Sequence, residues 1–173
     1  MPHMMDDFPL LLSTLYDRAV RLYPDQEIVS VDSDLAQRRQ TYAETDDRIR
    51  RLATAFATKL ALREGDVVGT FAWNNVRHHE LYWATANTGK VCHTLNIRLF
   101  PEQLSYVINH AEDKVIIVDE SLIPLLAKVR DELKTVEQII VVGGNGEGDR
   151  SLLGETLDYE TVLAAEQPGF AYP

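Results

Sequence analysis

The chain has 173 residues, of which 45% are hydrophobic, and this suits one folded domain with a substantial core. There are 27 acidic side chains against 17 basic ones, so the formal net charge is −10 and nucleic acid is not an expected partner. A single cysteine excludes an internal disulfide and a cysteine-rich metal site.

The apolar runs of the chain are short. The longest, such as residues 115–118 and 139–142, fall far below the roughly 18 to 20 residues that span a bilayer. Asp6 and Asp7 lie where a signal peptide would carry basic residues. We therefore expect a cytoplasmic protein with no transmembrane segment, and we leave open whether it contacts a membrane peripherally.

The first elements in chain order are a helix and a β-hairpin. Ser13 or Thr14 is a suitable N-cap for a helix over residues 14–23, which stops before a proline. Residues 27–31 and 38–42 are extended runs separated by turn-forming residues. They predict the two strands of a hairpin.

A second helix follows the hairpin directly. Thr41 and Glu44 form a capping box, in which each side chain bonds the backbone N–H of the other residue. Apolar residues then recur at helical spacing, so we expect this helix to continue to about Leu62.

From residue 67 onward, extended and helical patterns alternate. We expect strands over residues 67–72, 91–95, 114–119 and 138–142, and helices over residues 75–88, 101–111 and 122–133. This alternation predicts βαβ units, and the two continuous apolar runs fit central strands. The expected fold class is α/β, with a mainly parallel, doubly wound sheet, flanking helices and a short N-terminal β-hairpin.

We expect three segments along the chain. Residues 1–142 form the α/β subdomain, residues 143–157 a flexible glycine-rich loop, and residues 158–173 a short helix and an irregular tail. Asp158 is the expected N-cap of that short helix. The glycine-rich stretch is not read as a phosphate-binding loop, because it lacks a following Lys-Ser or Lys-Thr and contains two carboxylates.

No catalytic or metal-binding constellation is predicted. His78 and His79 are adjacent on a helix, point about 100° apart and cannot chelate one metal, so we interpret them as partly exposed residues beside Glu80. Cys92 lies mid-strand and is expected to be an inert core thiol. No G-x-S-x-G motif supports a hydrolase.

Polar residues follow two of the predicted strands, at the edge where open α/β sheets bind ligands. The candidates for lining a substrate site or an interface are Trp73, Asn74, Asn75, His79, Asn96 and Arg98. For Asn75 we favour a helix-capping role. Arg98 fits either contact with an anion or carboxylate, or plain exposure to solvent.

Two long runs resemble a known family. Residues 65–84, which include Trp73-Asn74-Asn75, and residues 89–104, which include Asn96-Ile97-Arg98, resemble the early part of AMP-forming long- and medium-chain fatty acyl-CoA synthetases. Residues 108–114 continue the likeness, and the resemblance covers roughly residues 9–166. One departure is Ile97, where that family often has proline, so a fixed φ angle is lost.

The resemblance implies a part of the large N-terminal domain of an adenylate-forming enzyme. Such enzymes join a fatty acid to ATP, with magnesium, to give acyl-AMP and pyrophosphate, and then transfer the acyl group to CoA. Their Ser/Thr/Gly-rich phosphate loop ending in Lys-Gly does not occur in these 173 residues. We therefore expect this portion to be inactive alone and to hold none of these ligands, while the resemblance also implies a homodimer through the N-terminal region.

Two alternatives remain at this point. The chain is alternatively a natural truncated, non-catalytic interaction or dimerisation module derived from the same family. A flavodoxin-like or nucleotide-binding domain unrelated to ligases is less favoured, because the first strand-to-helix turn lacks G-x-G-x-x-G. The sequence does not predict the length of the acyl chain.

Overall fold

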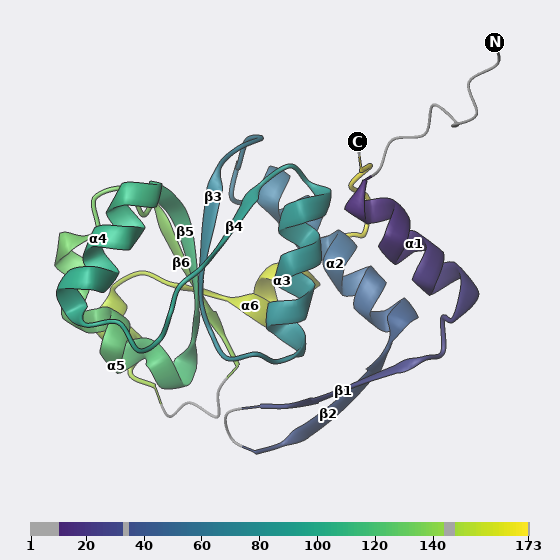
Figure 1. Cartoon of the computed structure of the whole chain (residues 1–173), viewed down its shortest axis with the longest axis horizontal. Helices are drawn as coiled ribbons and strands as arrows, with labels where there is room; N and C mark the ends of the chain where they lie inside the picture. The colour runs from purple at the N-terminus through teal and green to yellow at the C-terminus, as the bar shows by residue number, and fades with distance from the viewer. Residues whose placement is uncertain (1–10, 33–34, 144–147, 173) are drawn as a thin grey trace, which may run out of the picture.

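A five-stranded parallel sheet forms the centre of the molecule, as seen in a computed structural model that describes residues 11–32, 35–143 and 148–172 (Figure 1). Its strand order is β4-β3-β5-β6-β7. The strands are β3 (Val67–Phe71), β4 (Val91–Thr94), β5 (Asp113–Asp119), β6 (Gln138–Val142) and β7 (Leu157–Asp158). Every neighbouring pair is parallel, which confirms the expected α/β class.

Helices cover both faces of the sheet. On one face lie α2 (Tyr42–Ala57), α3 (Val76–Asn87) and α6 (Tyr159–Ala164), and on the other lie α4 (Pro101–Ala111) and α5 (Ile123–Leu126). Successive side chains of β5 alternate between these layers: Val115 and Ile117 join the core under α2 and α3, while Ile116 and Val118 join the core under α4 and α5. All four are fully buried, which explains why the sequence of this central strand is a continuous apolar run.

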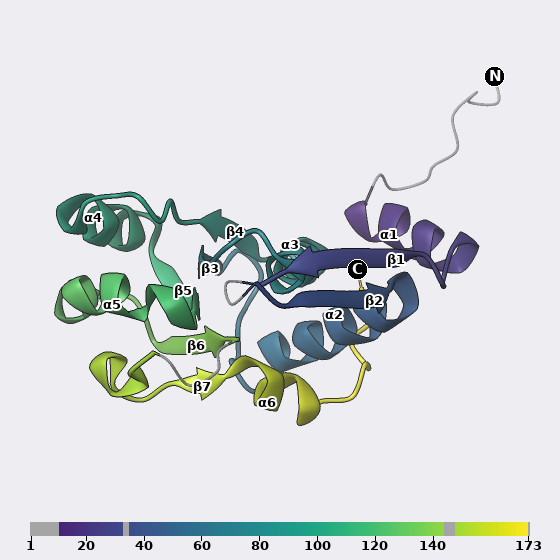
Figure 2. The ribbon, with the colours of Figure 1, turned by 90° about the horizontal axis from the view of Figure 1, so that it is seen from below.

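The predicted hairpin and capping box are present. Strands β1 (Glu27–Val31) and β2 (Gln37–Thr41) pair antiparallel, and the hairpin extends alongside α2 and α3 (Figure 2). The Thr41 backbone N–H donates to Glu44 Oε2 at 2.7 Å, and the Glu44 N–H donates to Thr41 Oγ1 at 3.2 Å. The box therefore fixes the point at which the hairpin becomes α2.

Two helix boundaries differ from the prediction. The first helix, α1, spans Leu12–Leu22, and its N-cap is Leu11 rather than Ser13 or Thr14. Ser13 is buried in its first turn, on the side of α1 that faces α3, while Leu12 and Leu15 are exposed. Helix α2 ends at Ala57, not near residue 62, and the chain then turns through residues 58–60 before Ala61 takes a positive φ of 50°. Non-helical Leu60 and Leu62 still enter the core.

The predicted helix over residues 122–133 is broken into three pieces. These are the 3₁₀ turn η1 (Glu120–Leu122), the single α-helical turn α5 and the 3₁₀ segment η2 (Ala127–Glu132). Pro124 lies in the first turn of α5, and since it has no N–H, an α-helix cannot run through it from the residues before. The expectation of one continuous helix was wrong.

The region after β6 contains more regular structure than the sequence indicated. The 3₁₀ helix η3 (Arg150–Leu153) and the first residue of the two-residue strand β7 lie within residues 143–157, where we expected a loop. Residues 144–147 of the expected loop lie outside the described residues. Asp158 is confirmed as the cap of α6, because its Oδ1 accepts from the Thr161 N–H at 2.8 Å.

The tail after α6 runs back over α2. Thr54 Oγ1 donates to the Gln167 carbonyl at 2.9 Å, and the Arg50 guanidinium lies 4.7 Å from the centre of the Tyr172 ring. Within the described part of the chain, no helix has the length and apolar character needed to cross a membrane.

Candidate functional site

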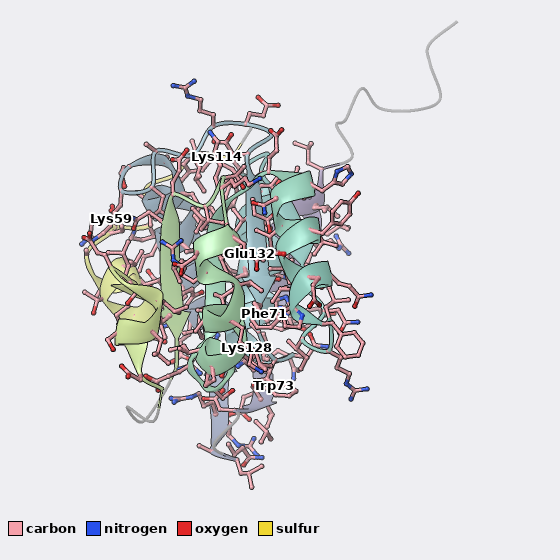
Figure 3. The ribbon with its side chains drawn as sticks, turned by 90° about the vertical axis from the view of Figure 1, so that its left-hand side faces the viewer. Lys59, Phe71, Trp73, Lys114, Lys128 and Glu132 are labelled. Atoms are coloured by element: carbon pink, nitrogen blue, oxygen red, sulfur yellow. The ribbon has the colours of Figure 1, made fainter. Side chains whose placement is uncertain are left out.

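The carboxyl ends of the parallel strands meet at one edge of the sheet, and Trp73 lies there at the end of β3. Figure 3 places Trp73 at this edge, Phe71 just inside it, and Lys114 at the opposite end. The Trp73 indole N–H donates to Ser121 Oγ at 2.9 Å, and Ser121 Oγ donates to Asp119 Oδ1 at 2.6 Å. The loops after β3 and β5 are thus joined, while the indole stays 42% exposed.

The predicted site residues of the first loop have separate roles. Asn75 caps α3, because its Oδ1 accepts from the backbone N–H groups of Arg77 and His78, each at 3.1 Å. The favoured capping interpretation is therefore confirmed. Asn74, by contrast, is exposed at the edge of the sheet.

The second loop carries Asn96 and Arg98. Asn96 Oδ1 accepts from the Arg98 backbone N–H at 2.9 Å, so the amide is used to shape the turn after β4. The Arg98 side chain is exposed, and no carboxylate of the described residues forms an ion pair with it. Its guanidinium is therefore available at the surface.

His79 does not lie at this edge; it is partly exposed, as expected, whereas His78 is buried, against the expectation. The His79 ring is half-buried, 6.1 Å from the Tyr16 ring and 6.2 Å from the Trp83 ring. His78 is only 6% exposed, and its Nε2 lies 3.0 Å from Thr70 Oγ1. Burial lowers the pKa of both rings, because the sheet and α1 cover the faces of α3 that carry them.

A polar cavity of about 590 Å³ lies between the hairpin, the helices α2 and α3, and the ends of β6 and β7. It is lined by Gln37, Arg38, Arg39, Gln40, Arg48, Arg77, Gly143, Arg150, Asp158 and Glu160. We call it the arginine cavity. No sequence motif indicated it, because its five arginines come from four elements that only the fold brings together.

A buried carboxylate, Glu80, supports one wall of the arginine cavity. Its side chain is fully buried and accepts from Arg48 Nε at 2.6 Å, Arg48 Nη2 at 3.1 Å, Gln40 Nε2 at 2.9 Å and the Tyr159 hydroxyl at 2.8 Å. Burial, reinforced by the Glu80 charge, raises the pKa of Tyr159 well above its ordinary value. Glu80 therefore has the dense set of donors that a buried charge needs.

The other arginines of the cavity are also paired. Arg77 is 6% exposed; its Nη1 lies 2.8 Å from Asp32 and its Nε 3.2 Å from Glu160. Arg150 lies 3.3 Å from Glu120 and 3.2 Å from Asp158. The cavity is thus lined by guanidinium groups whose charge neighbouring carboxylates already balance, and this ties the hairpin to the sheet edge.

These features define an α/β unit in which polar loops follow the carboxyl ends of the parallel strands and lie together at one edge of the sheet. Residues 16–169 match the family model described as AMP-binding enzyme. The chain therefore belongs to the family of AMP-binding enzymes, in agreement with the resemblance of its sequence.

Relatives support this assignment along nearly the whole chain. It is 41% identical to a 3-methylmercaptopropionyl-CoA ligase of Ruegeria lacuscaerulensis, 39% identical to a long-chain fatty-acid–CoA ligase of Thermus thermophilus, and 35% identical to a medium-chain fatty-acid–CoA ligase of Ectopseudomonas oleovorans. These matches cover 95% to 99% of this chain but only 30% to 32% of each relative. The chain thus spans about a third of the length of the curated relatives it matches.

The fold has a counterpart of known structure. The crystal structure of the anthranilate CoA ligase AuaEII in complex with anthranoyl-AMP matches 98% of this chain and 30% of that one, with a TM-score of 0.79. Sequence identity is 18%, so this likeness concerns the fold.

Proposed function

We propose that this chain is the N-terminal portion of a fatty acyl-CoA ligase that converts a fatty acid, ATP and CoA to acyl-CoA, AMP and pyrophosphate through acyl-AMP. The observation that carries the proposal is continuous similarity over at least 95% of the chain to ligases named for medium- and long-chain fatty acids. The 41% identity to a 3-methylmercaptopropionyl-CoA ligase makes a short thioether acid a second candidate substrate.

We further propose that these 173 residues do not catalyse the reaction alone. Adenylation needs donors preorganised around the triphosphate and its magnesium ion. The arginines of the arginine cavity are occupied by carboxylates, and the described residues include no group of three or more His, Cys, Asp or Glu side chains suited to a metal. Both observations support the proposal that these residues alone hold no Mg–ATP, and we derive no step through it.

The experiment that tests both points compares two proteins. The first is the 173-residue chain, titrated calorimetrically with ATP and magnesium and assayed for pyrophosphate release with octanoate, palmitate or 3-methylmercaptopropionate plus CoA. The second is a fusion in which these residues replace the matching third of the Ectopseudomonas oleovorans ligase. We expect no turnover from the chain and clear turnover from the fusion.

The two outcomes have separate meanings. Turnover by the isolated chain contradicts its proposed inactivity. A well-folded fusion that lacks activity with every acid, while the unmodified ligase is active, contradicts the proposed ligase function.

Within this proposal, the exposed residues Trp73, Asn74, Asn96 and Arg98 line the side of the sheet that meets substrate or the remainder of the enzyme. Their position just after the carboxyl ends of β3 and β4 supports this role. In the fusion, Arg98→Ala is expected to change the KM for one of the substrates, whereas Arg63→Ala, an exposed control, is not.

We also propose a cytoplasmic protein that forms a homodimer through its N-terminal region. The apolar residues Leu12 and Leu15 of α1 are 54% and 61% exposed, which favours association of this surface. Sedimentation equilibrium is expected to give a dimer for the chain and a monomer for Leu15→Glu. A monomeric parent chain would contradict the dimer.

A further inference from the structure

A second cavity, mostly apolar and of about 290 Å³, lies between α1, α3 and the edge strand β4. It is lined by Leu12, Tyr82, Trp83, Thr85, Ala86, Lys90 and Cys92. Figure 1 shows α3 between β4 and α1. Lys90 immediately precedes β4, so this cavity lies near the amino ends of the strands, away from Trp73 at their carboxyl ends.

The one charged side chain of this lining is Lys90, which is half-buried. Its Nζ donates to the Thr88 carbonyl at 2.8 Å and lies 5.7 Å from the centre of the Phe170 ring. Among the described residues, no carboxylate forms an ion pair with it, and the neighbouring Asp66 is bonded instead to Lys114 at 3.0 Å. Burial lowers the pKa of Lys90 against the opposing effect of the Asp66 and Glu64 charges, and a bound anion would further stabilise its charged form.

We propose that this cavity binds a small aliphatic carboxylate, with the hydrocarbon chain between Tyr82, Trp83 and Ala86 and the carboxylate paired with Lys90. The apolar lining recognises the chain, and the ammonium without a carboxylate partner recognises the head group. A volume near the lower end of the range for ligand pockets selects a short chain, such as octanoate. The proposal does not depend on the proposed ligase reaction, because it uses none of the residues at the carboxyl edge.

Cys92 provides the readout, because it lines the cavity and is the only cysteine of the chain. Its thiol is half-buried, not fully buried as the sequence predicted, and burial raises its pKa. The rate at which N-ethylmaleimide alkylates Cys92 therefore depends on how easily the reagent enters the cavity. A ligand in the cavity blocks that access.

The experiment measures the alkylation rate of the 173-residue chain with octanoate, with 1-octanol, and with neither. At ten times its dissociation constant, octanoate is expected to slow alkylation about tenfold. Lys90→Gln is expected to weaken octanoate binding about tenfold and to leave 1-octanol binding unchanged, since only the charged head group loses its partner. Lys59→Gln, an exposed lysine on α2's carboxyl side, is the matched control and should change neither.

A second variant tests the cavity itself. Ala86→Phe fills the space and is expected to abolish protection by both ligands, with circular dichroism confirming that the variant is folded. Should Ala86→Phe unfold, Ala86→Leu serves the same purpose. Equal binding of octanoate and 1-octanol, loss of octanoate protection in Lys59→Gln, or no protection of the parent chain at all overturns the proposal.

Discussion

His93 and Asp113 form a hydrogen bond although the strands that carry them, β4 and β5, are separated by β3. His93 Nδ1 lies 2.8 Å from Asp113 Oδ1. Gly69 lies opposite His93 in the register of β3 and leaves the space in which the two side chains meet. A Cβ atom on Gly69 would lie 2.5 Å from Asp113 Oδ2. Asp113 is fully buried, and burial raises its pKa to about 6 against the opposing effect of His93.

The raised pKa of Asp113 predicts a pH-dependent stability. The folded state holds this proton more tightly than the unfolded state, so its contribution to the free energy of unfolding is complete below about pH 4 and is lost as the pH rises through about 6. In the parent chain we expect the free energy of unfolding to fall by about 1 to 3 kcal/mol between pH 4 and pH 7 through this group. Asp113→Asn is expected to abolish that fall. Urea unfolding at several pH values measures it, and parallel pH profiles of the two proteins would refute the assignment.

The space at Gly69 predicts a coupled pair of substitutions. Gly69→Ala is expected to destabilise the chain by about 1 to 3 kcal/mol, because the added methyl group overlaps the Asp113 carboxylate. Combining it with Asp113→Ala should cost less than the sum of the two single changes. Gly169→Ala is the control, since its Cβ would meet nothing closer than 3.9 Å. Strict additivity at Gly69 and Asp113 would show that the overlap is relieved elsewhere.

The buried carboxylate of Glu80 predicts a large loss of stability on neutralisation. Glu80→Gln leaves Arg48 with one charged partner fewer and is expected to lower the free energy of unfolding by about 2 to 5 kcal/mol. Asp47→Asn, which breaks the partly buried i,i+4 pair with Arg51, is the matched control and should cost about 0.5 kcal/mol or less. Chemical denaturation of the two variants checks this, and similar losses would mean that Glu80 contributes no more than a surface pair.

The capping role of Asn75 predicts a structural effect. Asn75→Ala is expected to destabilise the chain by about 1 kcal/mol, because two backbone N–H groups at the start of α3 lose their acceptor. Asn75→Asp should retain most of the stability, since a carboxylate accepts the same bonds. Thermal unfolding compares the three proteins. Equal destabilisation by alanine and aspartate would argue against capping.

The sequence by itself determined the elements and their class. The Thr41–Glu44 capping box, the hairpin strands and Pro101 at the start of α4 were all predicted correctly, because each depends on residues a few positions apart. The continuous apolar run of β5 likewise identified a strand covered on both faces. Local propensity and periodicity suffice for such features.

Only the tertiary structure decided which distant side chains meet. His93 bonds Asp113 across an intervening strand, and Glu80, expected beside partly exposed histidines, is a fully buried acceptor for Arg48. The two-residue strand β7 is too short to give a sequence pattern and exists through its pairing with β6. These contacts depend on strand order and on how the helices pack against the sheet. Neither is encoded in the spacing of neighbouring residues, so the arginine cavity and the apolar cavity between α1, α3 and β4 form only when the chain is folded.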